Sequence, residues 1–272
     1  MKWLIARRLV QGLFLALFLT GPWFGVWITK GTLASSLTFD TLPLTDPFML
    51  LQSLVAGHAP ETAALVGAVL VLAAYAALGG RLYCSWVCPI NIVTDAAAWT
   101  RQRLGLKGGL KLDRRMRFVV LAAVLLASAG SGVIVWELVN PITLTHRALV
   151  FGGWGAVAAL AVFLFDTVVV LRGWCSHLCP VGAFYGFVGR FGLVKVAAPQ
   201  RARCDGCGDC YRVCPEPHVI TPALKGPGSL VIRAADCTAC GRCIDVCPRS
   251  VFAYARQPSR RAEAVTPLRQ GD

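Results

Sequence analysis

Charged residues are scarce in this sequence, and acidic ones most of all. Only 15% of its 272 residues are charged, with 14 Asp and Glu against 27 Lys and Arg, and the mean hydropathy is +0.61. A soluble domain of this length has a far more polar composition. The scarcity of charge therefore excludes an ordinary soluble protein and predicts that much of the chain lies in lipid.

A dinucleotide-binding fingerprint is also missing. No G-x-G-x-x-G turn occurs in the chain, so nothing indicates a flavin or nicotinamide cofactor. The net charge of +13 does not indicate nucleic acid, because the basic residues lie beside long apolar runs and not in a soluble patch. Any electrons that the protein handles must therefore come from another protein or from a lipid-soluble molecule.

Four apolar segments approach or reach the roughly 20 residues that span a bilayer as a helix. They cover residues 9–28, 63–80, 118–136 and 148–171. The first could also be a cleaved signal peptide, since Arg7 and Arg8 precede it, but it has the full spanning length and no small-residue cleavage site follows it. The sequence therefore predicts a membrane-embedded all-α four-helix bundle.

Lys and Arg are distributed unevenly between the loops. Residues 1–8 hold three, residues 81–117 hold eight and residues 172–272 hold fourteen, whereas residues 30–62 and 137–147 hold one each. By the positive-inside rule, both termini and the middle loop lie in the cytoplasm of a multi-pass inner-membrane protein. Thiols stay reduced there, so the twelve cysteines are available as metal ligands.

Related motifs follow the second and the fourth apolar segments. Residues 81–89 and 172–180 both read Arg-x-aromatic-Cys-Ser-x-x-Cys-Pro, 91 residues apart. This duplication predicts a pseudo-symmetric bundle with the two motifs side by side at the cytoplasmic surface. Thiols four residues apart share one helical face, and Pro ends the helix just beyond them. The four cysteines are Cys84, Cys88, Cys175 and Cys179. They are candidates for a redox-active dithiol, a metal site or a contact surface for electron transfer, while simple burial is the structural alternative.

From Val194 the composition changes from aliphatic to Cys, Arg, Asp, Gly and Pro, which marks a soluble domain. Two runs then repeat the C-x2-C-x2-C-x3-C-P spacing of bacterial ferredoxins, in which the fourth Cys ligates the other cluster. We assign one [4Fe–4S] cluster to Cys204, Cys207, Cys210 and Cys247, and a second to Cys214, Cys237, Cys240 and Cys243. Two complete runs that end in Pro argue against zinc or a redox disulfide.

The sequence therefore divides into three parts. Residues 1–193 form the transmembrane domain, residues 194–254 an α+β bacterial ferredoxin-like domain with two [4Fe–4S] clusters, and residues 255–272 a basic tail. The clusters transfer single electrons, so we expect an oxidoreductase subunit that conducts electrons.

Three polar residues are candidates for proton transfer. Asp166 lies inside the cytoplasmic end of the fourth apolar segment, where an ionisable group is a functional candidate by default, with an ion pair to Arg172 as the alternative. Asp46 and His58 lie in the outer loop, residues 30–62, which is unusually apolar. This loop could form a short interfacial helix beside a quinone pocket, dock a partner, or pack on the bundle as a lid.

The sequence resembles the NapH family, the membrane ferredoxin-type subunits of the quinol dehydrogenase that serves periplasmic nitrate reductase. The resemblance covers residues 3–253. The strings that carry it lie at residues 21–27 (GPWFGVW), 35–41 (SSLTFDT), 43–47 (PLTDP), 51–53 (LQS), 57–58 (GH), 84–89 (CSWVCP), 179–183 (CPVGA) and 214–218 (CPEPH). The outer-loop strings select this family among membrane polyferredoxins.

The resemblance implies that the protein oxidises membrane quinol, as substrate or bound electron donor. Electrons would pass with a periplasmic iron–sulfur partner subunit toward periplasmic nitrate reductase, with a membrane-anchored multihaem cytochrome as a further partner. One difficulty remains, because no recognisable cofactor spans the roughly 30 Å hydrocarbon core between cytoplasmic clusters and a periplasmic acceptor. The alternative function is an assembly factor that reduces a metal ion or thiol during maturation of another redox enzyme.

Overall fold

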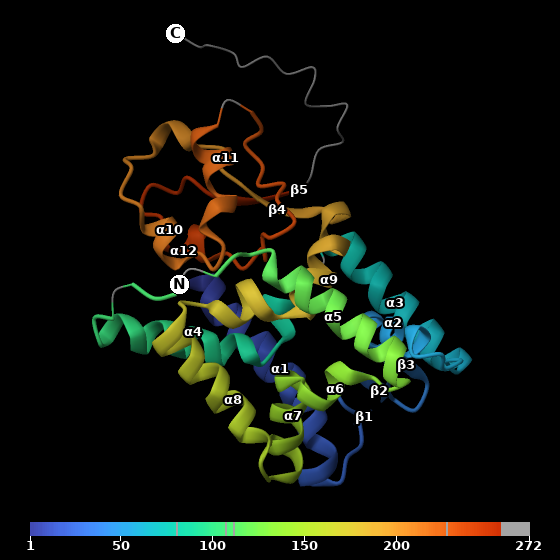
Figure 1. Ribbon diagram of the computed structural model, residues 1–272. Coiled ribbons are helices and arrows are strands. Elements are labelled where there is room, and N and C mark those ends of the chain that lie inside the picture. Colours follow the sequence, from blue (N-terminus) through green and yellow to red (C-terminus); the bar gives the residue numbers. More distant parts are fainter. Residues whose placement is uncertain (80, 107, 111, 227, 257–272) are drawn as a thin grey trace.

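The computed structural model describes residues 1–256 except 80, 107, 111 and 227. In Figure 1 the C-terminal residues from about 200 to 256, coloured orange to red, form one end of the molecule, and the long helices extend away from them. The amino terminus lies at the junction between the two parts. The predicted basic tail, residues 255–272, lies outside the described residues beyond Arg256.

The first apolar segment forms helix α1, Lys2–Phe24. Among the described residues, α1 is the one helix both long and apolar enough to cross a bilayer. It ends where Gly25 adopts a left-handed conformation (φ 72°), so residues 25–28 of the predicted span are not helical. Its first turn is docked, because the backbone N–H groups of Trp3 and Leu4 donate to the carboxylate of Asp245. The segment is therefore part of the packed structure.

The other three apolar segments form shorter helices than expected. They are α3 (Thr62–Leu78), α5 (Met116–Ser131), and α8 (Gly155–Leu164), which continues into the π-helical turn η2 (Phe165–Val169). The predicted span 118–136 ends early because Gly132 caps α5, and residues 135–139 form a separate helix, α6 (Val135–Val139). The predicted span 148–171 is interrupted at Gly152, where α7 (Pro141–Phe151) ends.

The apolar outer loop forms a small sheet and a helix. Strands β1 (Thr29–Gly31), β2 (Ser35–Thr38) and β3 (Leu42–Thr45) pair antiparallel in sequence order. Helix α2 (Pro47–Val55) follows, with the Asp46 carboxylate accepting from the Phe48 N–H at its start. The loop packs on α3 so closely that a Cβ at Gly67 would lie 2.8 Å from the Pro43 carbonyl oxygen. The loop therefore packs on the bundle, as the lid arrangement predicts, while a quinone pocket beside it and the docking of a partner stay predictions.

The two cysteine motifs share one local structure. Each forms a single π-helical turn, η1 (Tyr83–Val87) and η3 (Trp174–Leu178). The prediction that each motif lies on an α-helical end is therefore wrong, because the motifs form π turns. The Pro after each motif lies at the start of the next helix, α4 (Ile90–Arg103) or α9 (Pro180–Val188), where Pro is tolerated. Single π turns occur often at functional sites.

The ferredoxin-type end contains two strands and several one-turn helices. Strand β4 (Val194–Ala197) pairs antiparallel with β5 (Ala253–Arg256). The one-turn helices include α10 (Asp209–Val213), η6 (Pro217–Val219), α11 (Thr221–Lys225) and α12 (Arg242–Val246). A separate apolar core that includes Val196, Ile220 and Phe252 holds this end together.

Candidate functional site

The eight cysteines of the C-terminal runs gather around two separate pockets. The first, the distal pocket, is lined by Cys204, Cys207, Cys210 and Cys247. The second, the proximal pocket, is lined by Cys214, Cys237, Cys240 and Cys243. The fourth cysteine of each run therefore lies with the first three of the other, as the ferredoxin spacing predicts. Cys204 and Cys207 are exposed, which leaves the distal pocket open to solvent.

The chemistry of the proximal pocket suits an anionic thiolate-bound cluster. Burial alone would raise the pKa of the Cys240 thiol, but the guanidinium groups of Arg242 and Arg7 and nearby hydrogen-bond donors lower it to about 7. Nε and Nη1 of Arg7 and Nη1 of Arg242 are buried and have no hydrogen-bond acceptor among the described residues. Buried donors of this kind need an acceptor, and thiolate is the form of Cys that binds metals. Burial raises the pKa of the other three thiols of the pocket, so the arginines beside Cys240 are what makes the pocket fit an anionic iron–sulfur cluster.

One carboxylate forms ion pairs with the arginines beside Cys240 of the proximal pocket. Asp95, on α4, forms ion pairs of 2.5–3.8 Å with Arg7, Arg8, Arg172 and Arg242. Burial opposes ionisation of this carboxyl, yet Arg242 and Arg172 hold its pKa at about 2. Because the four guanidinium groups outnumber this one carboxylate, the cluster leaves positive charge beside Cys240. The sequence did not predict this group of Asp95 and four arginines, because its members lie far apart along the chain.

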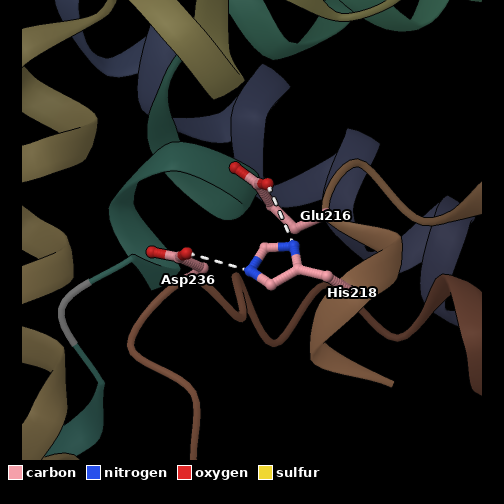
Figure 2. Close-up of side chains that lie close together, drawn as sticks. All are labelled: Glu216, His218 and Asp236. Carbon is pink, nitrogen blue, oxygen red and sulfur yellow. Dashed lines mark hydrogen bonds and ion pairs between the residues drawn. The ribbon is translucent and has the colours of Figure 1, made fainter. Parts of the chain in front are cut away.

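A second network joins the ferredoxin-type end to the helices. The Glu216 side chain is 1% exposed and accepts from Nη1 of Arg81 and Nη1 of Arg117, both at 3.3 Å. Figure 2 shows His218 between Glu216 and Asp236, with its Nε2 3.1 Å from the Asp236 carboxylate. These three side chains are close enough to hold a metal ion, but arginines already neutralise both carboxylates. These residues therefore hold the ferredoxin-type end against the helices. In the sequence, the string Cys-Pro-Glu-Pro-His at residues 214–218 is the pattern that marks them.

The two cysteine motifs both contact the proximal pocket. The Ser85 hydroxyl donates to the carbonyl of Thr238 at 2.7 Å, and the Ser176 hydroxyl donates to the carbonyl of Pro215 at 3.2 Å. Pro215 follows Cys214, and Thr238 lies between two other cysteines of the same pocket. The repeated Ser therefore has the same task in both motifs, and the structure brings the motifs together against one cluster pocket.

The cysteines of the two motifs lie next to each other. Cys84, Cys88, Cys175 and Cys179 belong to or pack against one apolar cluster, and electrostatic interactions couple Cys88 with Cys179 and Cys175 with both cysteines of the other motif. None of them is in a disulfide. The prediction that the two motifs lie side by side is therefore confirmed.

An apolar pocket lies beside the first motif and includes the outer loop. This pocket, called the outer pocket, has a cavity volume of about 110 Å³ and is lined by Phe14 and Phe18 of α1, by β-sheet residues, and by Tyr83 and Val87 of the motif. Its polar groups include Asp46 and the tyrosines Tyr75, Tyr83 and Tyr185. A mostly apolar pocket with a few polar groups is the usual form of a small-molecule site.

Asp46 is the carboxylate of the outer pocket. Its Oδ1 accepts from the Tyr185 hydroxyl at 2.9 Å and from the Phe48 N–H at 3.0 Å. Burial raises the pKa of Asp46 to about 6, although both hydrogen bonds oppose this shift. Tyr185 follows the second cysteine motif, so this contact joins a segment that the charge distribution places outside with one that it places inside. No pattern in the sequence indicated that the tyrosines of the outer pocket would lie beside Asp46.

The other two proton-transfer candidates lie elsewhere. His58 is exposed, and its Nε2 lies 2.8 Å from the Gly132 carbonyl oxygen. Asp166 is buried, and its Oδ1 accepts from the Trp174 N–H at 2.9 Å. Among the described residues, Arg172 forms its close ion pair with Asp95 and interacts with Asp166 only at longer range, so the alternative of an Asp166–Arg172 ion pair is not met. Of the three candidates, only Asp46 lines the outer pocket.

Family models match both parts of the chain. A 4Fe-4S binding domain matches residues 61–107 and 151–199, which contain the two cysteine motifs. A 4Fe-4S dicluster domain matches residues 203–251, which contain the eight ferredoxin-type cysteines. No solved structure matches the chain. These matches and the cysteine pockets define an iron–sulfur electron-transfer protein of ferredoxin type.

Relatives narrow the class further. The chain is 55% identical to the methylamine utilization ferredoxin-type protein MauN of Methylorubrum extorquens, over 86% of this chain and 82% of that protein. It is 51% identical to the ferredoxin-type protein NapH of Escherichia coli, over 86% and 83%, and 56% identical to MauN of Paracoccus denitrificans, over 93% and 90%. The chain belongs to the family of ferredoxin-type proteins that includes NapH and MauN, which confirms the resemblance to NapH.

Proposed function

We propose that this protein is the membrane-bound electron-transfer subunit of a quinol dehydrogenase. Quinol binds in the outer pocket, and its electrons pass by the cysteine motifs to the ferredoxin-type end. The observation that carries the proposal is the continuity of these sites. The outer pocket includes Tyr83 and Val87, which directly precede the two cysteines of the first motif. Ser85 of that motif contacts the backbone at the proximal pocket.

The proposal includes the architecture predicted from the sequence. The four apolar helices cross the inner membrane, and both termini and the ferredoxin-type domain, residues 194–254, lie in the cytoplasm. The distal and proximal cysteines each ligate one [4Fe–4S] cluster. When bound, such clusters transfer one electron at a time, so two of them can receive the electron pair of a quinol in single steps. The direct contact between Asp46 and Tyr185 shortens the distance that electrons have to cross.

Oxidation of a quinol to a quinone releases two electrons and two protons. Asp46 is placed to accept a proton, because its carboxylate lies in the outer pocket and has a pKa near the working pH. Tyr185 holds this carboxylate in position through its hydroxyl. Asp46 takes up one proton, and it accepts the second after it has released the first to solvent.

The physiological route follows the family resemblance. Electrons leave with a periplasmic iron–sulfur partner subunit toward periplasmic nitrate reductase, with a membrane-anchored multihaem cytochrome as a further carrier. A second candidate is electron supply to the maturation of another redox enzyme, as an assembly factor. It is favoured by the identities of 55% and 56% to two MauN proteins, which are higher than the 51% identity to NapH.

The test uses the purified full-length protein under anaerobic conditions. We expect a reduced quinone analogue to produce the EPR signals of reduced clusters, because quinol and clusters are joined within one chain or through the added iron–sulfur partner. Dithionite serves as the control that shows reducible clusters. Clusters that dithionite reduces but quinol leaves oxidised, with and without the partner, would contradict the proposal and favour the assembly role.

A further inference from the structure

The four motif cysteines share a hydrogen-bond pattern with the ferredoxin-type ligands. The Cys88 sulfur is approached by the backbone N–H of Ile90, two residues on, and the Cys179 sulfur by that of Val181. Both cysteines precede a Pro, which has no N–H of its own. In the proximal pocket, Cys214 also precedes a Pro and is approached by the N–H of Glu216, again two residues on. The second cysteine of each motif therefore has the local geometry of a cluster ligand.

Helix starts add to this environment. Cys88 directly precedes the Pro that opens α4, and Cys179 precedes α9, so free N–H groups of two helix starts point toward the two sulfurs. Burial raises the pKa of both thiols, and N–H groups at a helix start favour negative charge and oppose this rise. Arg81 adds positive charge to this site, because its guanidinium interacts with Cys84. The Nε of Arg81 is buried and has no acceptor among the described residues.

The spacing of the thiols distinguishes a cluster from a single ion. Around a tetrahedral zinc with Zn–S bonds of about 2.3 Å, sulfur atoms lie about 3.8 Å apart. Within the described residues, no three cysteine sulfurs lie within 4.8 Å of one another, either in these motifs or in the ferredoxin-type runs. A cluster separates its thiolates more widely than one ion does, because each thiolate binds a different corner or edge. Both sets of cysteines therefore have the wrong spacing for zinc.

We propose that Cys84, Cys88, Cys175 and Cys179 bind a third iron–sulfur cluster, with two ligands from each repeat. The 4Fe-4S binding domain that matches residues 61–107 and 151–199 contains all four of these cysteines and none of the other eight. The site lies between the outer pocket and the proximal pocket, where Ser85 and Ser176 connect the motifs to the proximal cysteines. This inference goes beyond quinol oxidation and stands independently of it.

The experiment counts iron and acid-labile sulfide in the anaerobically purified full-length protein. Three four-iron clusters give about twelve irons per chain. Changing all four motif cysteines to Ser is expected to remove about a third of the iron while the EPR signals of the two ferredoxin-type clusters persist. A matched control, Cys204→Ser with Cys207→Ser, should also remove about a third but abolish the signal of the distal cluster.

Two results would overturn the third cluster. One is a wild-type protein with about eight irons per chain, with or without one zinc. The other is a motif variant that keeps the wild-type iron content. Should the fourfold variant fail to fold, the wild-type count still decides, and the single-motif variant Cys175→Ser with Cys179→Ser provides a milder change. The count requires no quinol, so its failure is distinguishable from failure of the proposed function.

Discussion

Replacing Asp46 with Asn is expected to slow quinol-dependent cluster reduction by about 100-fold or more, the usual contribution of a positioned proton acceptor. Asn has nearly the same shape, is a good helix cap, and can still accept from Phe48 N–H and the Tyr185 hydroxyl. The variant therefore removes the proton acceptor and little else. Stopped-flow measurement of cluster bleaching with a reduced quinone analogue reports the rate, and dithionite reduction should be unchanged.

The pH dependence of the rate of quinol-dependent cluster reduction is a second test of the role of Asp46. Burial raises the pKa of Asp46 to about 6, so the carboxyl is protonated below this pH and unable to accept a proton. The wild-type rate should rise as the pH increases through about 6, and this rise should vanish in Asp46→Asn. The groups that face Asp46 are Tyr75, Tyr83, Tyr185 and Glu137. Burial raises the pKa of Tyr83 and of Tyr185, so both stay protonated in this range.

Tyr185→Phe is the matched control for position. It removes the hydroxyl that donates to Asp46 and leaves the carboxyl in place. Without this donor the carboxylate is less stabilised, so the midpoint of the pH profile should move upward. Equal rates and equal pH profiles for the wild type and Asp46→Asn would exclude Asp46 as the proton acceptor, whatever Tyr185→Phe does.

Replacing Glu216 with Gln is expected to lower the midpoint of thermal unfolding by about 10 °C. The carboxylate is almost fully buried against Arg81 and Arg117, and loss of one partner from a buried ion pair costs about 3–5 kcal/mol because charges remain uncompensated. Since the arginines belong to the helices and Glu216 to the ferredoxin-type end, the two parts should separate more easily. Thermal unfolding in detergent and limited proteolysis at the junction measure both effects.

A surface ion pair supplies the control for this variant. Lys30 and Asp40 lie 2.6 Å apart but are both exposed, and such pairs contribute at most about 1 kcal/mol. Asp40→Asn should therefore leave the unfolding midpoint nearly unchanged. If Glu216→Gln and Asp40→Asn behave alike, the Glu216 network does not hold the two parts together.

Expectations from the sequence were most accurate where the chemistry is local. The spacing of the two ferredoxin-type runs assigned each cysteine to a group of four, and the structure places the same groups around the distal and proximal pockets. The repeat of the two motifs also predicted their neighbourhood. Helix bounds were less accurate: Gly132 ended α5 early and Gly152 divided the last apolar segment, because glycine favours conformations that end a helix.

The sequence by itself determined how the eight ferredoxin-type cysteines divide into two groups of four, since this division follows from their spacing along the chain. Only the tertiary structure decided which polar residues meet. It placed Asp46 beside Tyr185 in the outer pocket and left His58 and Asp166 outside that pocket. It also surrounded Glu216 with arginines more than 90 positions away in the chain. Such contacts arise from packing between distant segments, which no local pattern encodes.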